Sequence, residues 1–355
     1  MHSLINEENV MTGIYKVGGC VRDTAMGLDP HDVDYVVVGS TEQEMLDLGF
    51  DKVGSGFPVF IHPTTRCEYA LARTEKKTGK GYLEFETYFG PEVTLEQDLE
   101  RRDFTMNAMA YRNDEIFDPF NGLHDIANGV IRHVNAQAFI EDPVRILRAA
   151  RFAARYDFIV DSETVALINK ISIDDIDAIP RERVMKELEK ALKDGKGYQF
   201  MKNLYEFNDC MVDLFFGCCF TERLWAIDDL YKQIGFHAVM VYFAEVTGGA
   251  IFLRNNKASS DSLFLYRLVI TASQRHVLEP SDVYELIMQS DYFRRPKFLE
   301  ELELYLRITT LNISFIAKQM ATVNASDLDP SLKGIEIRDA LNKERRKVFD
   351  TLVGL

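Results

Sequence analysis

The stretch that decides the fold is KVGGCVRDTAMGLDPHDVDYVVVGST, residues 16–41. It completes a short run of β-forming residues and places Gly18 and Gly19 directly before a segment of helical character that closes at Gly27. Glycine lets the backbone approach a ligand closely, and a helix N-terminus offers unpaired N–H groups. The order of strand, glycine pair and helix is therefore compatible with a phosphate-binding turn, but by itself it more often marks a tight strand-to-helix turn without a ligand.

Two aspartates mark the start of the next apolar run, DYVVVG. Asp32 and Asp34 are two residues apart, and side chains at i and i+2 of a strand point to the same face. Two neighbouring carboxylates repel each other unless solvent screens them or a cation binds between them. Mg²⁺ prefers hard oxygen ligands and substrate phosphates, so the pair predicts a site for phosphoryl or nucleotidyl transfer. A solvated pair at an exposed strand entrance is the alternative.

The wider sequence divides into two parts that differ in their pattern of apolar residues. Residues 13 to about 135 carry short β-rich runs separated by turn residues: IYKV, DYVVVG, PVFIH, EYALA and NAMAY. From Asp142 onward the apolar residues follow a helical period, and no proline occurs between Pro180 and Pro280. We therefore expect an α/β front half, a helical back half, a domain boundary near residues 136–142 and a loop over residues 248–261.

Composition narrows the class of protein. The chain has 355 residues, 46% of them hydrophobic and 27% charged, as in soluble globular proteins. At roughly 150 residues per domain, this length predicts two or three domains. There is no apolar run of about 18 residues and no apolar signal core in MHSLINEENVMTG, so we expect a cytoplasmic protein without a membrane partner. Five cysteines without a CxxC pair indicate reduced thiols.

The net charge of −15 argues against nucleic acid as a partner, because polyanions are bound by Lys and Arg. Binding depends on local clusters of basic residues rather than on the net charge, and this chain contains such clusters. Four arginines, at spacings that keep them on one helix face, are Arg145, Arg148, Arg151 and Arg155. Two later groups are Arg181, Arg183, Lys186, Lys190, Lys193 and Lys196, and Lys343, Arg345, Arg346 and Lys347. These later groups are equally consistent with solvated helix faces that alternate Lys and Glu.

Further blocks follow the opening stretch in order. They are FPVFIHP, EYALARTE, LERRDFTMNAMAY, DPFNGLHDI, EDPVRILRAARFAARY and RERVMKELEKAL. Together with residues 16–41 they resemble, motif after motif, the class II bacterial CCA-adding tRNA nucleotidyltransferases, whose head is of the polymerase-β-like kind. The resemblance covers residues 12 to about 192, and KGIEIRDALNKERRKVF, residues 333–349, resembles the tail of that family.

The resemblance implies an α+β fold in three parts. Residues 1–140 would form a catalytic nucleotidyltransferase head around a mixed sheet, residues 141–200 a helical neck that recognises the base, and residues 201–355 a helical body and tail that bind tRNA. The implied activity is template-independent addition of CCA to the 3′ end of tRNA from CTP and ATP, with Mg²⁺ as cofactor. The segment TEKKTGKGYLEFETY, residues 74–88, resembles the loop used in switching from C to A addition, which favours a complete CCA enzyme.

The resemblance also assigns roles to individual residues. The catalytic carboxylates that bind the metal would be Asp32 and Asp34. The incoming triphosphate would be held by Gly19, Arg22 and Arg102, and the base would be read by Asp142, Arg145 and Arg148. Glu68, in EYALA, is a candidate third acidic residue, but strand surfaces often carry Glu.

Two of these residues have structural alternatives. Arg102 could form an ion pair on a helix surface with Glu96, Gln97 or Glu100, and a capping box of Thr94 and Gln97 supports a helix there. Asp142 before Pro143 has the form of a helix N-cap with proline at the first helical position. Both roles of Asp142 could coexist.

Two departures from related enzymes bear on function. The longest family members carry a phosphohydrolase domain with a His-Asp pair, but beyond residue 192 the histidines are His237 and His276, neither followed by Asp, so we expect that domain to be absent. Bacterial poly(A) polymerases share the head but usually carry a Gly-Arg-Arg/Lys-Phe signature where this chain has VVGSTEQEM. A catalytically inactive RNA-binding homologue is a third possibility, against which the intact carboxylates and arginines argue.

Overall fold

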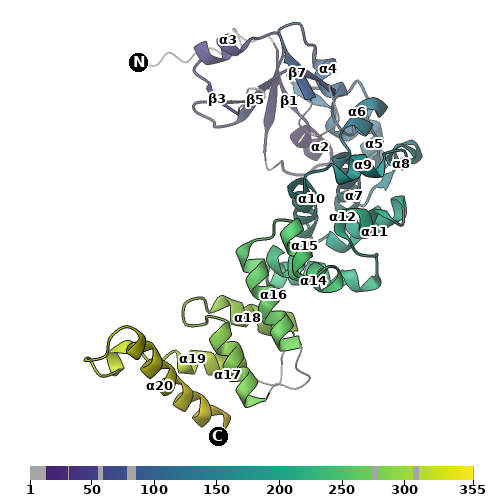
Figure 1. Ribbon diagram of the computed structural model, residues 1–355. Coiled ribbons are helices and arrows are strands. Elements are labelled where there is room, and N and C mark those ends of the chain that lie inside the picture. Colours follow the sequence, from purple (N-terminus) through teal and green to yellow (C-terminus); the bar gives the residue numbers. More distant parts are fainter. Residues whose placement is uncertain are drawn as a thin grey trace. The chain divides into compact units, whose positions relative to one another are not determined.

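The computed structural model describes residues 13–30, 32–54, 59–77, 85–273, 279–306 and 312–354. The chain divides into two compact units, residues 1–220 and 221–355. Within the described residues every strand lies in the first unit, whereas the second is built from helices (Figure 1). This arrangement confirms the α+β class predicted from the sequence.

The first unit contains a mixed sheet. Among the described residues it has seven strands in the order β3-β4-β5-β2-β1-β8-β9. Their bounds are β1 Ile14–Val17, β2 Asp34–Val37, β3 Asp51–Val53, β4 Val59–Ile61, β5 Glu68–Leu71, β8 Ala110–Arg112 and β9 Glu115–Phe117. Strands β2 and β5 are parallel, and the other neighbouring strands are antiparallel.

The sheet topology brings two parts of the opening stretch together. Because β1 and β2 are antiparallel, the end of β1 lies beside the start of β2, and Val17 is paired with Asp34. Because β2 and β5 are parallel, their first residues are also neighbours, and Asp34 is paired with Glu68. The glycine turn after β1 and the acidic residues at the starts of β2 and β5 therefore share one edge of the sheet.

Two smaller sheets accompany the main one. Strand β6 (Arg73–Lys77) pairs with β7 (Phe85–Phe89) in an antiparallel ribbon. Of the predicted C-to-A loop, residues 74–88, the part from 78 to 84 lies outside the described residues. Strand β10 (Val130–Ile131) pairs in parallel with β11 (Ile159–Val160), so one short strand lies in the half expected to be helical.

The first unit also contains helices, which alternate with the strands and then follow them along the chain. They are α2 Gly19–Ala25, α3 Glu42–Asp47, α4 Leu95–Glu100, α5 Gly122–Ala127, α6 Ala136–Glu141, α7 Val144–Tyr156, α8 Ser162–Ile168, α9 Ile173–Asp177, α10 Arg181–Lys193, α11 Gly197–Phe207 and α12 Met211–Phe216. The expected neck border at residue 200 falls inside α11, which packs against α7. Its buried residues Phe200, Met201 and Leu204 hold it in the first unit.

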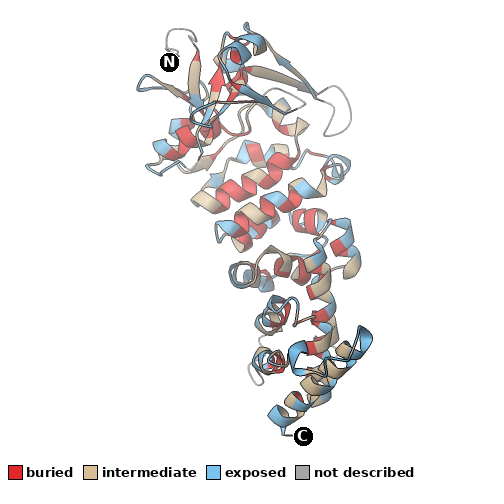
Figure 2. Cartoon of the chain, turned by 90° about the vertical axis from the view of Figure 1, so that its left-hand side faces the viewer, coloured by how far each residue is buried: buried red, intermediate tan, exposed pale blue. Residues whose placement is uncertain are grey.

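Helix α7 carries the predicted arginine face. Its apolar residues, including Ile146, Leu147 and Ala150, are fully buried, in line with the helical period of the sequence. The helix ends at Tyr156, and the C-cap residue Asp157 has a φ of 57°, in the left-handed region. Figure 2 shows buried residues gathered along the inner sides of the helices and strands, with exposed residues on their outer sides.

The second unit is a set of packed helices. They are α13 Ala226–Gln233, α14 Phe236–Val246, α15 Ala250–Asn255, α16 Ser260–Ser273, α17 Pro280–Gln289, α18 Lys297–Leu306, α19 Ile313–Met320 and α20 Ile335–Val353. Their shared core includes Leu265, Leu286, Phe298 and Phe349. No helix in the described ranges has both the length and the apolar character needed to cross a bilayer.

Two local predictions were wrong. Residues 248–261 are not a loop, because α15 occupies their middle and buries Phe252 and Leu253 against neighbouring helices; this packing overrides the turn-rich composition. The run NAMAY is a strand only from Ala110, since residues Thr105–Asn107 form a 3₁₀ turn.

Candidate active site

The acidic edge of the sheet is formed by Asp32, Asp34 and Glu68, all exposed to solvent. Partial loss of hydration raises the pKa of Asp34, the negative charges of Glu68 and Asp32 raise it further, and Arg102 lowers it. In the part of the chain that the structure describes, no three His, Cys, Asp or Glu side chains are placed to hold a metal by themselves. A small group of carboxylates with excess negative charge still fits a divalent cation that takes its remaining oxygens from substrate and water.

The glycine turn beside this edge is shaped by two arginines. Gly18 has a φ of 71°, which favours glycine, and a Cβ added there would lie 2.7 Å from Nη1 of Arg102. A Cβ on Gly19 would lie 3.5 Å from Nη2 of Arg22. The bare backbone at the start of α2 therefore makes room for two guanidinium groups, as expected of a turn that binds phosphate.

Arg102 forms an ion pair with Asp98, a fully buried residue of α4. Nη2 of Arg102 donates to Oδ2 of Asp98 at 3.1 Å, and Nε of Arg102 has no hydrogen-bond partner among the described residues. The expected capping box of Thr94 and Gln97 is confirmed. The sequence suggested an ion pair of Arg102 with Glu96, Gln97 or Glu100. The structure has Asp98 as the partner instead, because Asp98 lies four residues, about one helical turn, before Arg102.

Arg22 lines the same region but is tied into a network of its own. Its Nε and Nη2 donate to Oδ1 of Asp23 at 2.8 and 2.7 Å, and its Nη1 donates to Oδ1 of Asn107 at 2.6 Å. The guanidinium also lies over the rings of Phe152 and Tyr156, 5.1 Å from each centroid. Arg22 therefore links α2 to α7, and its predicted contact with the triphosphate stays a prediction.

The third residue of the RRD block, Asp103, joins the head to α7. Its Oδ2 accepts from Nε of Arg148 at 2.6 Å, and its Oδ1 accepts from Nδ2 of Asn107 and from the N–H of Phe104. Burial by itself raises the pKa of Asp103, but the charges of Arg148 and Arg145 outweigh it and hold the pKa at about 2. Asp103 is therefore ionised at neutral pH and fixes Arg148 in place.

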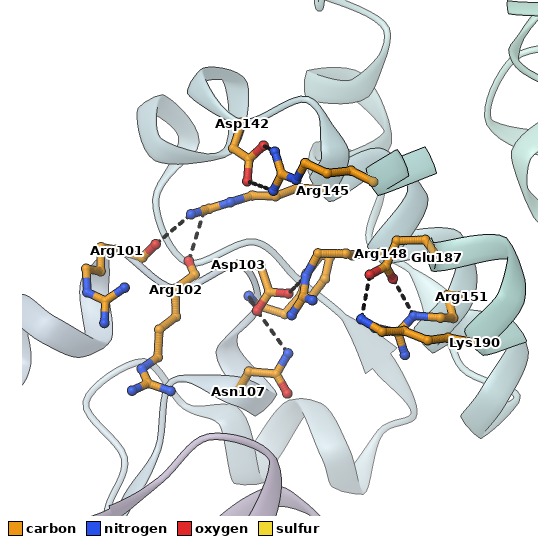
Figure 3. Close-up of polar contacts among 12 residues, drawn as sticks. Arg101, Arg102, Asp103, Asn107, Asp142, Arg145, Arg148, Arg151, Glu187 and Lys190 are labelled. Carbon is orange, nitrogen blue, oxygen red and sulfur yellow. Dashed lines mark hydrogen bonds and ion pairs between the residues drawn. The ribbon is translucent and has the colours of Figure 1, made fainter. Parts of the chain in front are cut away.

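Asp142 and Arg145, two of the three residues expected to read the base, do not pair with each other. Both oxygens of Asp142 accept from Arg183 of α10, at 2.9 and 3.0 Å. Arg145 donates instead to the carbonyl oxygens of Arg101 and Arg102, at 2.6 and 3.1 Å (Figure 3). The expected N-cap role of Asp142 was wrong, because α7 starts without a side-chain cap and the Asp142 carboxylate is held by Arg183.

These side chains meet around one cavity of about 660 Å³. The predicted residues that line it are Gly19, Arg22, Asp34, Arg102, Asp142, Arg145 and Arg148, while Asp32 is not among the lining residues. Ten basic and five acidic side chains line it, so the cavity is positive although the chain carries −15 overall. Its volume falls within the roughly 300–1,000 Å³ of small-molecule sites.

The neck side of the cavity carries the rest of the arginine face. Arg151 and Arg155 line it with Lys190 and Lys193 of α10. Nε of Arg151 and Nζ of Lys190 donate to the two oxygens of Glu187, at 2.5 and 2.8 Å. All four arginines of the predicted face therefore reach one cavity, and part of the first later basic group joins them.

Sequence reasoning missed the acidic partners of these arginines. Three ion pairs were not predicted: Asp98 with Arg102, Asp103 with Arg148, and Glu187 with Arg151. Asp103 lay inside a quoted block, but nothing in its spacing pointed to Arg148, which is 45 residues away. Glu68 was weighed as a third acid, and its pairing with Asp34 supports its placement at the acidic edge.

Two segments of the first unit match known protein families. Residues 14–132 match the poly(A) polymerase head domain, and residues 157–208 match the probable RNA and SrmB-binding site of polymerase A. Among solved structures, a tRNA-processing enzyme complex is 25% identical with a TM-score of 0.65, covering 95% of this chain and 97% of that one. The CCA-adding enzyme of Bacillus stearothermophilus in complex with CTP is 22% identical with a TM-score of 0.66, covering 95% and 89%. A CCA-adding enzyme with ATP is 21% identical with a TM-score of 0.66, covering 95% and 86%.

The head-domain match defines the class of the first unit: residues 14–132 form a head domain of the poly(A) polymerase type. Over 95% of its residues, the chain shares the fold of CCA-adding enzymes solved with CTP and with ATP. The fold expected from the sequence motifs is thereby confirmed.

Proposed function

We propose that this protein adds CCA to the 3′ end of tRNA, taking CTP and ATP in turn without a nucleic-acid template. The observation that carries the proposal is the single positive cavity, in which the glycine turn, Asp34, Arg102, Asp142 and Arg145 meet. Related structures with CTP and with ATP share its fold. A partner RNA is supported by the match of residues 157–208 to an RNA-binding segment, and the cytoplasm is the compartment where such an enzyme meets tRNA.

The triphosphate would lie at the glycine turn. The N–H groups at the start of α2 and the Arg102 guanidinium would bind its oxygens, and Gly18 and Gly19 leave space for both. Asp32 and Asp34 would hold Mg²⁺, which when bound supplies positive charge to the attacking 3′-oxygen and to the departing pyrophosphate. The protein itself contributes position and fixed charge, which dominate catalysis of phosphoryl transfer.

The base would be read beside Asp142 and Arg145. Cytosine and adenine both present an amino donor next to a ring-nitrogen acceptor, whereas uracil and guanine present a carbonyl next to an N–H. A carboxylate and a guanidinium match the first two bases and mismatch the others. Asp142 and Arg145 already have protein partners, but a carboxylate offers about four lone-pair sites and a guanidinium five N–H donors, so both keep capacity for a base.

The test is incubation of the purified protein with tRNA lacking its terminal CCA and with each labelled nucleotide in turn. We expect CTP to be added twice, ATP once, and UTP and GTP not at all. A tRNA that already ends in CCA is the matched control and should accept nothing. Repeated ATP addition to unrelated RNA would indicate a poly(A) polymerase, and binding of tRNA without any addition would indicate an inactive homologue.

A further inference from the structure

Asp98 is a buried charge that the proposed chemistry does not use. It is 0% exposed and lies on α4, four residues before Arg102. An isolated buried carboxylate is costly, so its partners must compensate for lost hydration. Burial raises the pKa of Asp98, but Arg101 and Arg102 outweigh burial and lower it, so the carboxylate is ionised at neutral pH.

The two oxygens of Asp98 have different partners. Oδ1 accepts from Nε and Nη2 of Arg101, at 3.1 and 2.8 Å, and from the N–H of Arg73 at 3.2 Å. Oδ2 accepts from Nη2 of Arg102 at 3.1 Å. The hydrogen bonds from Arg101, just after α4, and from Arg73, at the start of β6, therefore fix the orientation of the carboxylate. Oδ2 then accepts the hydrogen bond that holds Arg102.

The other terminal nitrogen of the Arg102 guanidinium faces the glycine turn. Nη1 of Arg102 lies 2.7 Å from the position that a Cβ on Gly18 would occupy. Arg101 and Arg102 line both the large cavity and a second one of about 180 Å³ that also contains Asp34, Glu68 and Asp98. Asp98 therefore contacts both arginines next to Asp34, which also lines both cavities.

We propose that Asp98 is a positioning residue, which fixes the Arg102 guanidinium against the glycine turn so that it is already oriented for the triphosphate of the incoming nucleotide. This inference rests on the proposed function. An arginine side chain has many rotamers, and holding it in place before binding removes an entropic cost from nucleotide affinity. Asp98 needs no contact with the nucleotide to have this effect.

The experiment compares Asp98→Asn with Glu96→Gln, which removes one charge from an exposed position of the same helix. The dissociation constants of CTP and of inorganic triphosphate are measured by calorimetry on the full chain. We expect Asp98→Asn to weaken both by about tenfold, equivalent to about 1.4 kcal/mol, and Glu96→Gln to leave both unchanged. Thermal melting establishes that each variant is folded.

A double-mutant cycle separates positioning from general damage. In an Arg102→Ala background, Asp98→Asn should weaken triphosphate binding no further, because the residue it positions is gone. Equal losses in both backgrounds, or wild-type affinity in Asp98→Asn, would overturn the proposal. If Asp98→Asn does not fold, Asp98→Glu keeps the charge but shifts the carboxylate by one methylene, and wild-type triphosphate affinity in that variant would contradict positioning.

The outcome is distinguishable from failure of the proposed function. If triphosphate binding depends on Arg102 and on Asp98 as expected but the wild-type protein does not extend tRNA, CCA addition is refuted and the inference is kept. If the wild-type protein extends tRNA but Asp98→Asn binds CTP with wild-type affinity, the inference about Asp98 is refuted and CCA addition is kept. Absence of triphosphate binding by the wild-type chain would refute the role given to Arg102 and with it the inference.

Discussion

Replacing Asp103 by Asn tests how the head is joined to α7. Asn keeps the shape of the side chain and one oxygen that can accept from Asn107 and from the N–H of Phe104. The group that faces Nε of Arg148 changes from a charged acceptor to an amide that can present its N–H₂. The variant therefore removes one charge-assisted hydrogen bond and the strongest of the negative charges that act on Arg148.

Two routes give the size of the effect. The pKa of Asp103 falls from 3.8 to about 2 on folding, and at 1.36 kcal/mol per unit this corresponds to about 2 kcal/mol. A hydrogen bond to a charged group contributes roughly 1.5–3 kcal/mol. We therefore expect Asp103→Asn to lower the free energy of unfolding of the first unit by about 2–3 kcal/mol at pH 7.

Urea unfolding followed by circular dichroism between pH 3 and pH 7 is the assay, with the exposed Asp177→Asn as the matched control. Because the pKa is lower in the folded state, Asp103 stabilises the fold at pH values above about 4, and its contribution disappears as pH falls toward 2. The difference between wild type and Asp103→Asn should thus be constant near neutral pH and shrink below pH 4. A difference of less than about 0.5 kcal/mol at pH 7, typical of a surface substitution, would refute the reasoning.

Four further substitutions, in three predictions, test the site. Asp34→Asn should lower single-turnover CTP addition by at least about 100-fold, or about 2.7 kcal/mol, with an unchanged circular dichroism spectrum; near-normal turnover would refute the two-carboxylate assignment. Asp142→Ala or Arg145→Ala should relax selection against UTP and GTP, which costs roughly 1–3 kcal/mol per good base contact, with little change in tRNA affinity in filter binding; full selectivity would place base reading elsewhere. Gly18→Ala should weaken CTP binding in calorimetry and lower stability by about 1 kcal/mol or more, since the new Cβ meets Arg102 at a positive φ; wild-type CTP affinity would show that the turn does not bind phosphate.

The order of local elements at the site was predictable from the sequence. The strand before Gly18, the helix after it and the strand that starts at Asp34 all form where the local pattern placed them. The capping box at Thr94 and the arginine face of α7 were likewise predictable. Each of these features depends on residues within one or two turns of one another, so spacing and residue type are sufficient to specify them.

The partners of the charged side chains were decided by the tertiary structure alone. Asp142 is followed three residues later by Arg145, yet its carboxylate is taken by Arg183, 41 residues away, and Arg145 turns to two backbone carbonyls. A guanidinium can reach any acceptor within a wide radius, so the choice depends on which helix is packed nearby. The sequence determined which residues are available for nucleotide chemistry, and the packing of α4, α7 and α10 determined which of them hold one another in place, because burial penalises every charge that is left without a partner.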